Sequence, residues 1–138
     1  MGFPVADFNR EAKEFTLPRE HIALTASTTV KLYKVPAGRK LRVDRVQYYN
    51  VTGLVEDNDN NFAFEVKNGS VVVASVFNTD ANLDPDTGAS LPANTNVTAA
   101  SVDGANVLSE GDELTAVFTE TGTATLPAGF YIIEGRLL

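Results

Sequence analysis

Residues 62–77 of the chain read FAFEVKNGSVVVASVF, and they contain the clearest structural signal in the sequence. Phe62, Phe64 and Val66 alternate with smaller or charged residues, and a valine-rich run follows Asn68-Gly69. An alternation with a period of two is typical of a β-strand with one buried face. An Asn-Gly pair between two such runs favours a tight turn, because both central residues of a type I′ turn need a positive φ. The stretch therefore predicts an antiparallel hairpin.

The same alternation predicts strands over residues 30–35, 41–48, 95–102, 113–119 and 130–136. Within 41–48 the apolar positions change parity at Asp44-Arg45, which indicates a β-bulge. Four corners precede strands, and each opens with an apolar residue that can close an end of the fold: Val35, Leu91, Leu108 and Leu126. We therefore expect an all-β fold, a single antiparallel β-sandwich or jelly roll. The predicted core residues are Val43, Val46, Phe64, Val73, Phe118 and Ile132.

The first 28 residues differ from the remainder because they show no sustained period. We expect them to form an extended N-terminal arm, with residues 29–138 forming the β-sandwich domain. The arm contains Phe3, Phe8 and Phe15, and a disordered tail seldom carries so many aromatic residues. These three side chains are therefore expected to lie against the domain itself or against another subunit.

The charge of the chain is unevenly distributed. Its net charge is −7, yet residues 29–50 hold six bases and one acid, whereas residues 51–135 hold one base and thirteen acids. The simplest interpretation is a solvated face of two strands. The alternative is an electrostatic docking stripe, for which the candidate interface residues are Lys31, Lys34, Arg42 and Arg45. Nucleic acid is not an expected partner, because the acidic remainder would repel phosphate.

Length and composition limit the classes of protein to consider. With 138 residues the chain is long enough for one domain. It has no cysteine, which excludes disulfides and thiol chemistry. No apolar run approaches the roughly 18 residues that a membrane span needs, and the first residues lack the basic and apolar regions of a secretory signal. We expect no membrane partner.

Few residues indicate catalysis or metal binding. The one histidine, His21, lies in the predicted arm, and no nucleophile elbow or phosphate loop is present. A glycosidase-type pair of carboxylates is the remaining enzymatic alternative. We expect no enzyme, no catalytic residues and no cofactor. The loop of residues 78–93 offers the only metal candidates, Asp80, Asp84 and Asp86, but it departs from an EF-hand at Pro85 and Leu91, so no calcium requirement is expected.

Residues 35–46 read VPAGRKLRVDRV, and a Tyr-Asn-x-Thr-Gly turn follows at residues 49–53. Together with the hairpin and the closing LPAGFY at residues 126–131, this arrangement resembles the head-decoration, or cement, proteins of tailed bacteriophages. The resemblance covers residues 29–138 and implies a jelly-roll-like homo-oligomer, often a trimer, that binds the outer surface of the capsid. The implied partner is the major capsid protein, and the implied location is the virion surface after synthesis in the host cytoplasm.

The alternative function is a carbohydrate- or receptor-binding β-sandwich of a tail fibre or adhesin. Exposed aromatic side chains in a shallow groove would favour it, and the candidates are Tyr33, Tyr48, Tyr49 and Tyr131. The absence of tryptophan weighs against this alternative.

Overall fold

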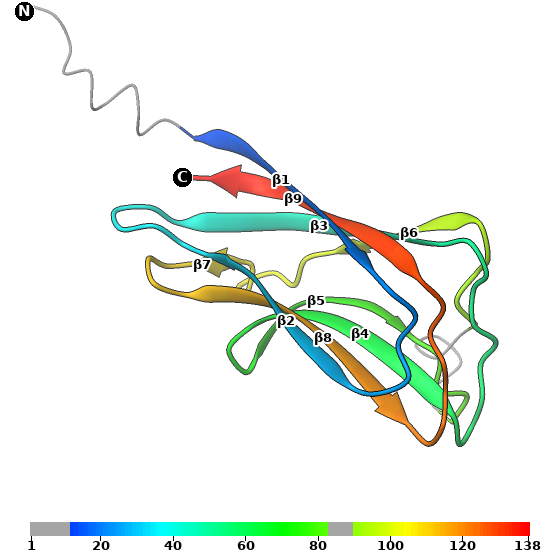
Figure 1. The fold of residues 1–138 in the computed structure, drawn as a ribbon. Coiled ribbons are helices and arrows are strands. Elements are labelled where there is room, and N and C mark those ends of the chain that lie inside the picture. The colour runs from blue at the N-terminus through cyan, green and yellow to red at the C-terminus, as the bar shows by residue number, and fades with distance from the viewer. Residues whose placement is uncertain (1–11, 83–89) are drawn as a thin grey trace, which may run out of the picture.

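The computed structural model describes residues 12–82 and 90–138, which form two antiparallel sheets stacked face to face (Figure 1). The first sheet contains, in spatial order, β1 (Lys13–His21), β9 (Gly129–Leu137), β3 (Leu41–Asn50) and β6 (Thr95–Ala100), and the short β7 (Val107–Leu108) also pairs with β3. The second sheet contains β2 (Thr28–Lys34), β8 (Glu113–Thr121), β4 (Asn61–Asn68) and β5 (Val71–Asn78). The all-β prediction is confirmed.

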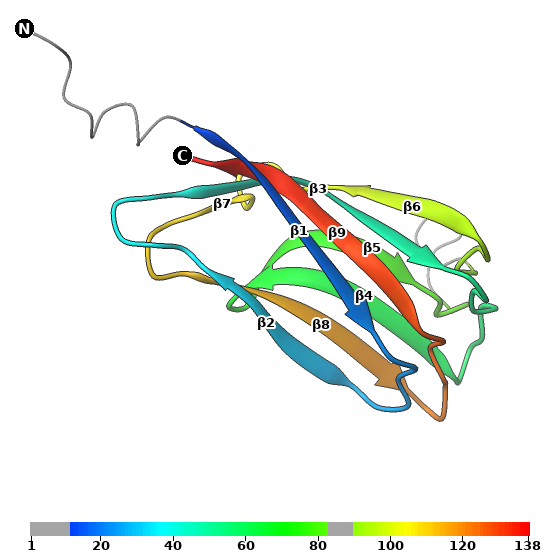
Figure 2. The same ribbon diagram turned by 45° about the horizontal axis from the view of Figure 1, so that its top comes forward.

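The connectivity is that of a jelly roll. Apart from the β4–β5 hairpin and the β6–β7 link, each step along the chain crosses from one sheet to the other. Leaving out the short β7, eight strands thus divide into two sheets of four, as in jelly rolls. Figure 2 shows the two layers with β1 and β9 lying side by side across the first sheet.

The described part of the predicted arm belongs to the sandwich. β1 pairs with β9 at every position from Lys13↔Leu137 to His21↔Gly129, and Phe15 is buried with its ring 4.9 Å from that of Tyr33. The expected domain boundary at residue 28 is therefore corrected, since the sandwich already includes Lys13. Phe3 and Phe8 lie outside the described residues.

The core agrees with the predicted set except in β9. Val43, Val46, Phe64 and Val73 are fully buried and Phe118 is 1% exposed. Their centre is an aromatic cluster in which the Phe64 and Phe118 rings stack 4.3 Å apart.

Ile132 was wrongly predicted to lie in the core. Tyr131 and Ile133 point inward instead, and Ile132 lies on the outer face. β9 is apolar on both parities from Phe130 to Ile133, so its period alone does not identify the buried face.

Two local predictions are met with one change of detail. The register of β3 against β9 shifts between Val43 and Arg45, so the bulge is confirmed. The β4–β5 hairpin is also present, but its two-residue turn is Gly69-Ser70, because Asn68 is paired with Val71. Gly69 has φ 59°, which suits the first central position of a type II′ turn rather than the expected type I′.

The four apolar corner residues all fill the ends of the sandwich, as predicted. Val35, Leu91, Leu108 and Leu126 are each at most 3% exposed. Leu91 and Leu126 lie at the end where β3 finishes and β9 starts, whereas Val35 and Leu108 lie at the opposite end.

Candidate functional site

Four connections meet at one end of the sandwich, on the right-hand side of Figure 1. They join β1 to β2, β3 to β4, β5 to β6, and β8 to β9. We call their described residues the loop end: 22–27, 51–60, 79–82, 90–94 and 122–128. The jelly-roll connectivity brings these segments together although they are far apart in the sequence.

The β3–β4 connection holds the loop end together. Leu54 and Leu91 exchange backbone hydrogen bonds of 3.1 and 2.8 Å, and the backbone N–H of Asp57 donates to the carbonyl of Thr79. On its other side, the Asn60 side-chain oxygen accepts a 2.9 Å hydrogen bond from the backbone N–H of Thr123. Long polar loops are often mobile, but this one is tied to two neighbouring connections.

Gly53 permits the closest of these contacts. It has φ +75°, and a Cβ atom there would lie 2.6 Å from the Leu91 carbonyl oxygen and 2.8 Å from the Ala93 nitrogen. Both the left-handed backbone and the close approach favour glycine at this position.

A partly buried network of hydrogen bonds joins His21, Tyr48 and Asn50 next to the loop end. The Nδ1 of His21 lies 2.7 Å from the carbonyl oxygen of Ile22, which only accepts, so Nδ1 carries the proton. Its Nε2 then accepts a 2.6 Å hydrogen bond from the Tyr48 hydroxyl. That hydroxyl also accepts from Nδ2 of Asn50, which donates as well to the carbonyl of Pro127 at 2.7 Å.

Burial determines the protonation states in this network. Desolvation lowers the pKa of His21 from 6.5, although its bond to the Ile22 carbonyl acts in the opposite direction. Desolvation also raises the pKa of Tyr48 to about 12, so its hydroxyl stays protonated at neutral pH. The sequence analysis offered His21 only as an isolated residue, whereas the structure shows it joining β1 to β3.

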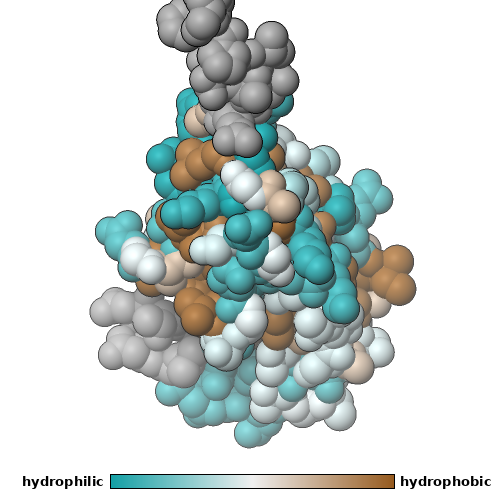
Figure 3. Space-filling view, turned by 90° about the vertical axis from the view of Figure 1, so that its left-hand side faces the viewer, coloured by the Kyte–Doolittle hydropathy of each residue, from teal (hydrophilic) through white to brown (hydrophobic). Residues whose placement is uncertain are grey.

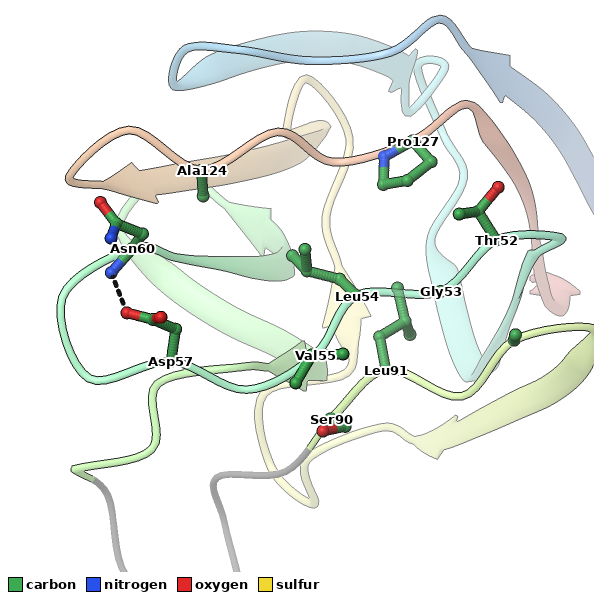
Figure 4. A pocket seen from close by; sticks show the side chains of 11 residues that line it. Thr52, Gly53, Leu54, Val55, Asp57, Asn60, Ser90, Leu91, Ala124 and Pro127 are labelled. Carbon is green, nitrogen blue, oxygen red and sulfur yellow. Dashed lines mark hydrogen bonds between the residues drawn. The ribbon is translucent and has the colours of Figure 1, made fainter.

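The most exposed large apolar side chains of the described residues lie in the loop end. Ile22, Val55 and Val51 are 80%, 77% and 65% exposed, and no other large apolar side chain in the described ranges exceeds 48%. Beside Val55 lies an open depression of about 630 Å³ with Leu54 and Leu91 in its lining (Figure 4). Single exposed aliphatic residues are ordinary, but several on one surface are typical of a contact site.

The loop end is also acidic. Its described residues include Glu56, Asp57, Asp59 and Asp80 but no lysine or arginine. Hydrogen bonds from the backbone N–H groups of Asp59 and Asn60 lower the pKa of Asp57, which therefore remains charged at neutral pH.

The predicted basic stripe does not form one surface. Lys31 and Lys34 lie on β2 of the second sheet, whereas Arg42 and Arg45 lie on β3 of the first. Three of the four side chains have acidic partners: Lys31 lies 3.9 Å from Glu113, Arg42 lies 2.9 Å from Asp44, and Arg45 pairs with Glu134. The expectation of a continuous stripe is corrected, because the turn at residues 35–40 carries the chain from one sheet to the other. Figure 3 looks onto this opposite end, where hydrophilic and apolar side chains are interspersed.

The tyrosine candidates divide between the core and the surface. Tyr48 and Tyr131 are buried. Tyr33 is partly buried against the core. Tyr49 lies on the outer face of the first sheet with its ring 5.2 Å from that of the exposed Phe130. A shallow groove beside Phe130 includes Pro18 and Ile132 in its lining.

The metal candidates are not brought into a ligand set in the described ranges. Asp80 accepts a 2.9 Å hydrogen bond from the backbone N–H of Asn82, as an aspartate in a turn does. Asp84 and Asp86 lie outside the described residues. Across residues 12–82 and 90–138, no three histidine, aspartate or glutamate side chains are close enough to hold a metal ion. The same ranges contain no helix of the length and apolarity that crossing a membrane requires.

Comparisons with known proteins give little further information. No known protein family and no curated protein matches the sequence. Among solved structures, the chain is similar to one from the structure of infectious bursal disease virus, Gx strain. The match has a TM-score of 0.37 and 12% sequence identity, and it covers 92% of this chain but 31% of the other.

Proposed function

We propose that this protein is a structural virion protein that binds the outer surface of a bacteriophage capsid and stabilises its lattice. The observation that carries the proposal is the loop end, where Ile22, Val51 and Val55 are held out into solvent on connections fixed by hydrogen bonds. A surface formed before binding loses little conformational entropy when it docks. Binding, rather than chemistry, is the activity that such a surface supports.

The jelly-roll topology is compatible with this role. Eight-stranded jelly rolls occur in viral capsid proteins, lectin domains and cupins, so the topology admits the proposal without selecting it. The sequence resemblance to head-decoration proteins selects the capsid among these possibilities. His21, the most obvious catalytic candidate, is already engaged at both ring nitrogens, which supports a non-enzymatic role.

The proposed assembly is a homotrimer that contacts the major capsid protein. Residues 1–11 carry Phe3 and Phe8, and the strand that begins shortly after them, β1, is an edge strand of the first sheet. Deleting residues 1–11 removes both aromatic side chains and leaves β1 in place. The deletion is expected to lower the oligomeric mass or the capsid affinity; unchanged values for both would show that this segment contributes to neither interface.

A carbohydrate- or receptor-binding function is the second candidate, supported by the Tyr49–Phe130 ring pair on an open face. Two of the four tyrosine candidates are in the core, which leaves a small aromatic platform.

Co-sedimentation tests the proposal. The purified protein is mixed with capsids encoded by the same genome, and the bound fraction is measured across protein concentrations. Saturable binding that also raises the temperature at which the capsids disrupt is the expected result. Absence of binding to mature capsids, together with binding to host-cell glycans, would favour the second candidate.

A further inference from the structure

We propose that the loop end is the docking end, and that it fits a basic protein surface in which an apolar hollow is ringed by lysine and arginine side chains. This inference rests on the proposed function, because the surface that carries the hollow is assigned to the capsid protein.

The apolar residues lie on two connections of the same end of the sandwich. Ile22 follows β1 and Val51 follows β3, and both strands flank Gly129 of β9, since His21 and Asn50 are each paired with Gly129. Neighbouring strands lie about 4.8 Å apart, so the backbones of the two residues are separated by roughly two strand spacings. Val55 lies four residues further along the same connection as Val51. All three side chains are exposed at this one end of the sandwich.

The charged side chains of the described loop end are all acidic. Glu56, Asp57, Asp59 and Asp80 accompany the apolar residues, and the described loop end contains no base to neutralise them. Acidic side chains at the rim of an interface increase the rate of encounter with a basic surface and disfavour an acidic one. The negative charge of the loop end thus favours a positively charged partner surface.

A second exposed apolar surface lacks this property. On the outer face of the first sheet, Phe130 is 43% exposed, and the groove beside it includes both Arg19 and Glu20 in its lining, so charges of both signs lie nearby. Arg45 pairs with Glu134, and Gln47 also donates to that carboxylate at 2.6 Å. This face consequently specifies no partner charge, and the loop end is the better docking surface.

The loop end is also rigid enough to dock without refolding. Leu24 and Leu126 exchange two backbone hydrogen bonds of 2.8 Å, which join the β1–β2 and β8–β9 connections. With the contacts of Leu54 and Asn60 described above, hydrogen bonds join the described parts of all four connections. Preorganisation of this kind allows a modest apolar area to give useful affinity.

Two pairs of matched substitutions test the inference by capsid co-sedimentation. Glu56→Lys reverses a charge in the loop end, and Asp103→Lys makes the same change at the opposite end; both side chains are exposed and have no hydrogen bond or ion pair with the described residues. Val55→Ser and Val102→Ser remove an exposed valine, 77% and 44% exposed, from a connection at either end.

Glu56→Lys is expected to weaken binding about three- to tenfold at 0.1 M salt, and the difference should shrink at 1 M, where the Debye length is about 3 Å. Val55→Ser is expected to weaken binding about tenfold at both salt concentrations, because valine burial is lost. The two opposite-end variants should bind like the wild type.

Three results would overturn the inference. Equal loss from the two ends, or loss only from the Asp103→Lys and Val102→Ser variants, would place docking elsewhere. Tighter binding by Glu56→Lys would mean an acidic partner surface. A drop in oligomeric mass with capsid binding retained would make the loop end a contact between copies. If the wild type itself does not bind capsids, the proposed function fails rather than the assignment of the docking end.

Discussion

Removing the hydroxyl of Tyr48 probes the network beneath the loop end. Tyr48→Phe keeps the ring, which lies 5.0 Å from Phe77 and 5.6 Å from Phe64. It removes the 2.6 Å hydrogen bond to Nε2 of His21 and one of the two acceptors of Asn50 Nδ2, which retains the Pro127 carbonyl. The main consequence is that Nε2 of the half-buried His21 ring loses its hydrogen-bond donor.

An unsatisfied polar group of this kind costs about 1–3 kcal/mol. Unfolding entropy is roughly 2.1 cal/mol/K per residue near 60 °C, so for 138 residues each kcal/mol corresponds to about 3.5 °C in the melting temperature. Tyr48→Phe is therefore expected to melt about 3–10 °C below the wild type in differential scanning calorimetry.

The neighbouring tyrosine provides the control. The Tyr49 hydroxyl donates to Asn94 at the surface, so Tyr49→Phe is expected to change the melting temperature by less than about 2 °C, in line with surface substitutions. If Tyr48→Phe melts within 1 °C of the wild type, or no lower than Tyr49→Phe, the hydroxyl does not hold the network together and the reasoning is refuted.

Four further predictions concern pH, backbone, core and metal. Burial lowers the pKa of His21, so as the pH falls the unfolded chain binds a proton before the folded chain does. The contribution of His21 to the free energy of unfolding is therefore fully present above pH 6.5 and declines as the pH falls towards the lowered pKa, by well under about 1.4 kcal/mol per pH unit. A wild-type melting temperature that falls no faster than that of His21→Gln between pH 7.5 and 5.5 would contradict this prediction. Gly53→Ala should destabilise the protein by at least about 1 kcal/mol more than Gly38→Ala, since both glycines have φ +75° but only Gly53 is crowded. Equal urea denaturation midpoints for the two variants would show that the close approach at Gly53 does not affect stability. Phe64→Ala should cost about 3–5 kcal/mol in urea unfolding, and less than about 1 kcal/mol would mean that Phe64 does not support the core. EDTA should leave the melting temperature unchanged, and a decrease of more than about 5 °C would show that a metal ion stabilises the fold.

The sequence predicts the strands well where one face is apolar and the other is not. Phe62, Phe64 and Val66 show this pattern, and β4 follows it. Of β1, the sequence indicates only a short strand at residues 15–17, because its inward face becomes polar halfway along: after Phe15 and Leu17 come Arg19 and His21. Arg19 donates to the carbonyl of Leu32 and His21 binds Tyr48. Burial of such residues depends on partners in other strands, which a local period does not reveal.

The candidate site was harder to predict than the fold. Val51 and Val55 stand in a polar loop, which is a weak local signal, and Ile22 adjoins the predicted arm. They lie at the same end of the molecule because the jelly-roll connectivity gathers four loops there. The basic residues show the reverse case, since Lys31 and Arg45 are close in the sequence but lie on different sheets.

Cryo-electron microscopy of capsids incubated with the protein tests the proposed function and its docking end together. The account predicts jelly-roll density on the outer surface of the capsid, with the loop end of each copy against the lattice and Val51 and Val55 over an apolar hollow ringed by basic side chains. Capsids that bear no such density at saturating protein concentration would contradict the proposed function, and density with the loop end directed into solvent would contradict the docking end.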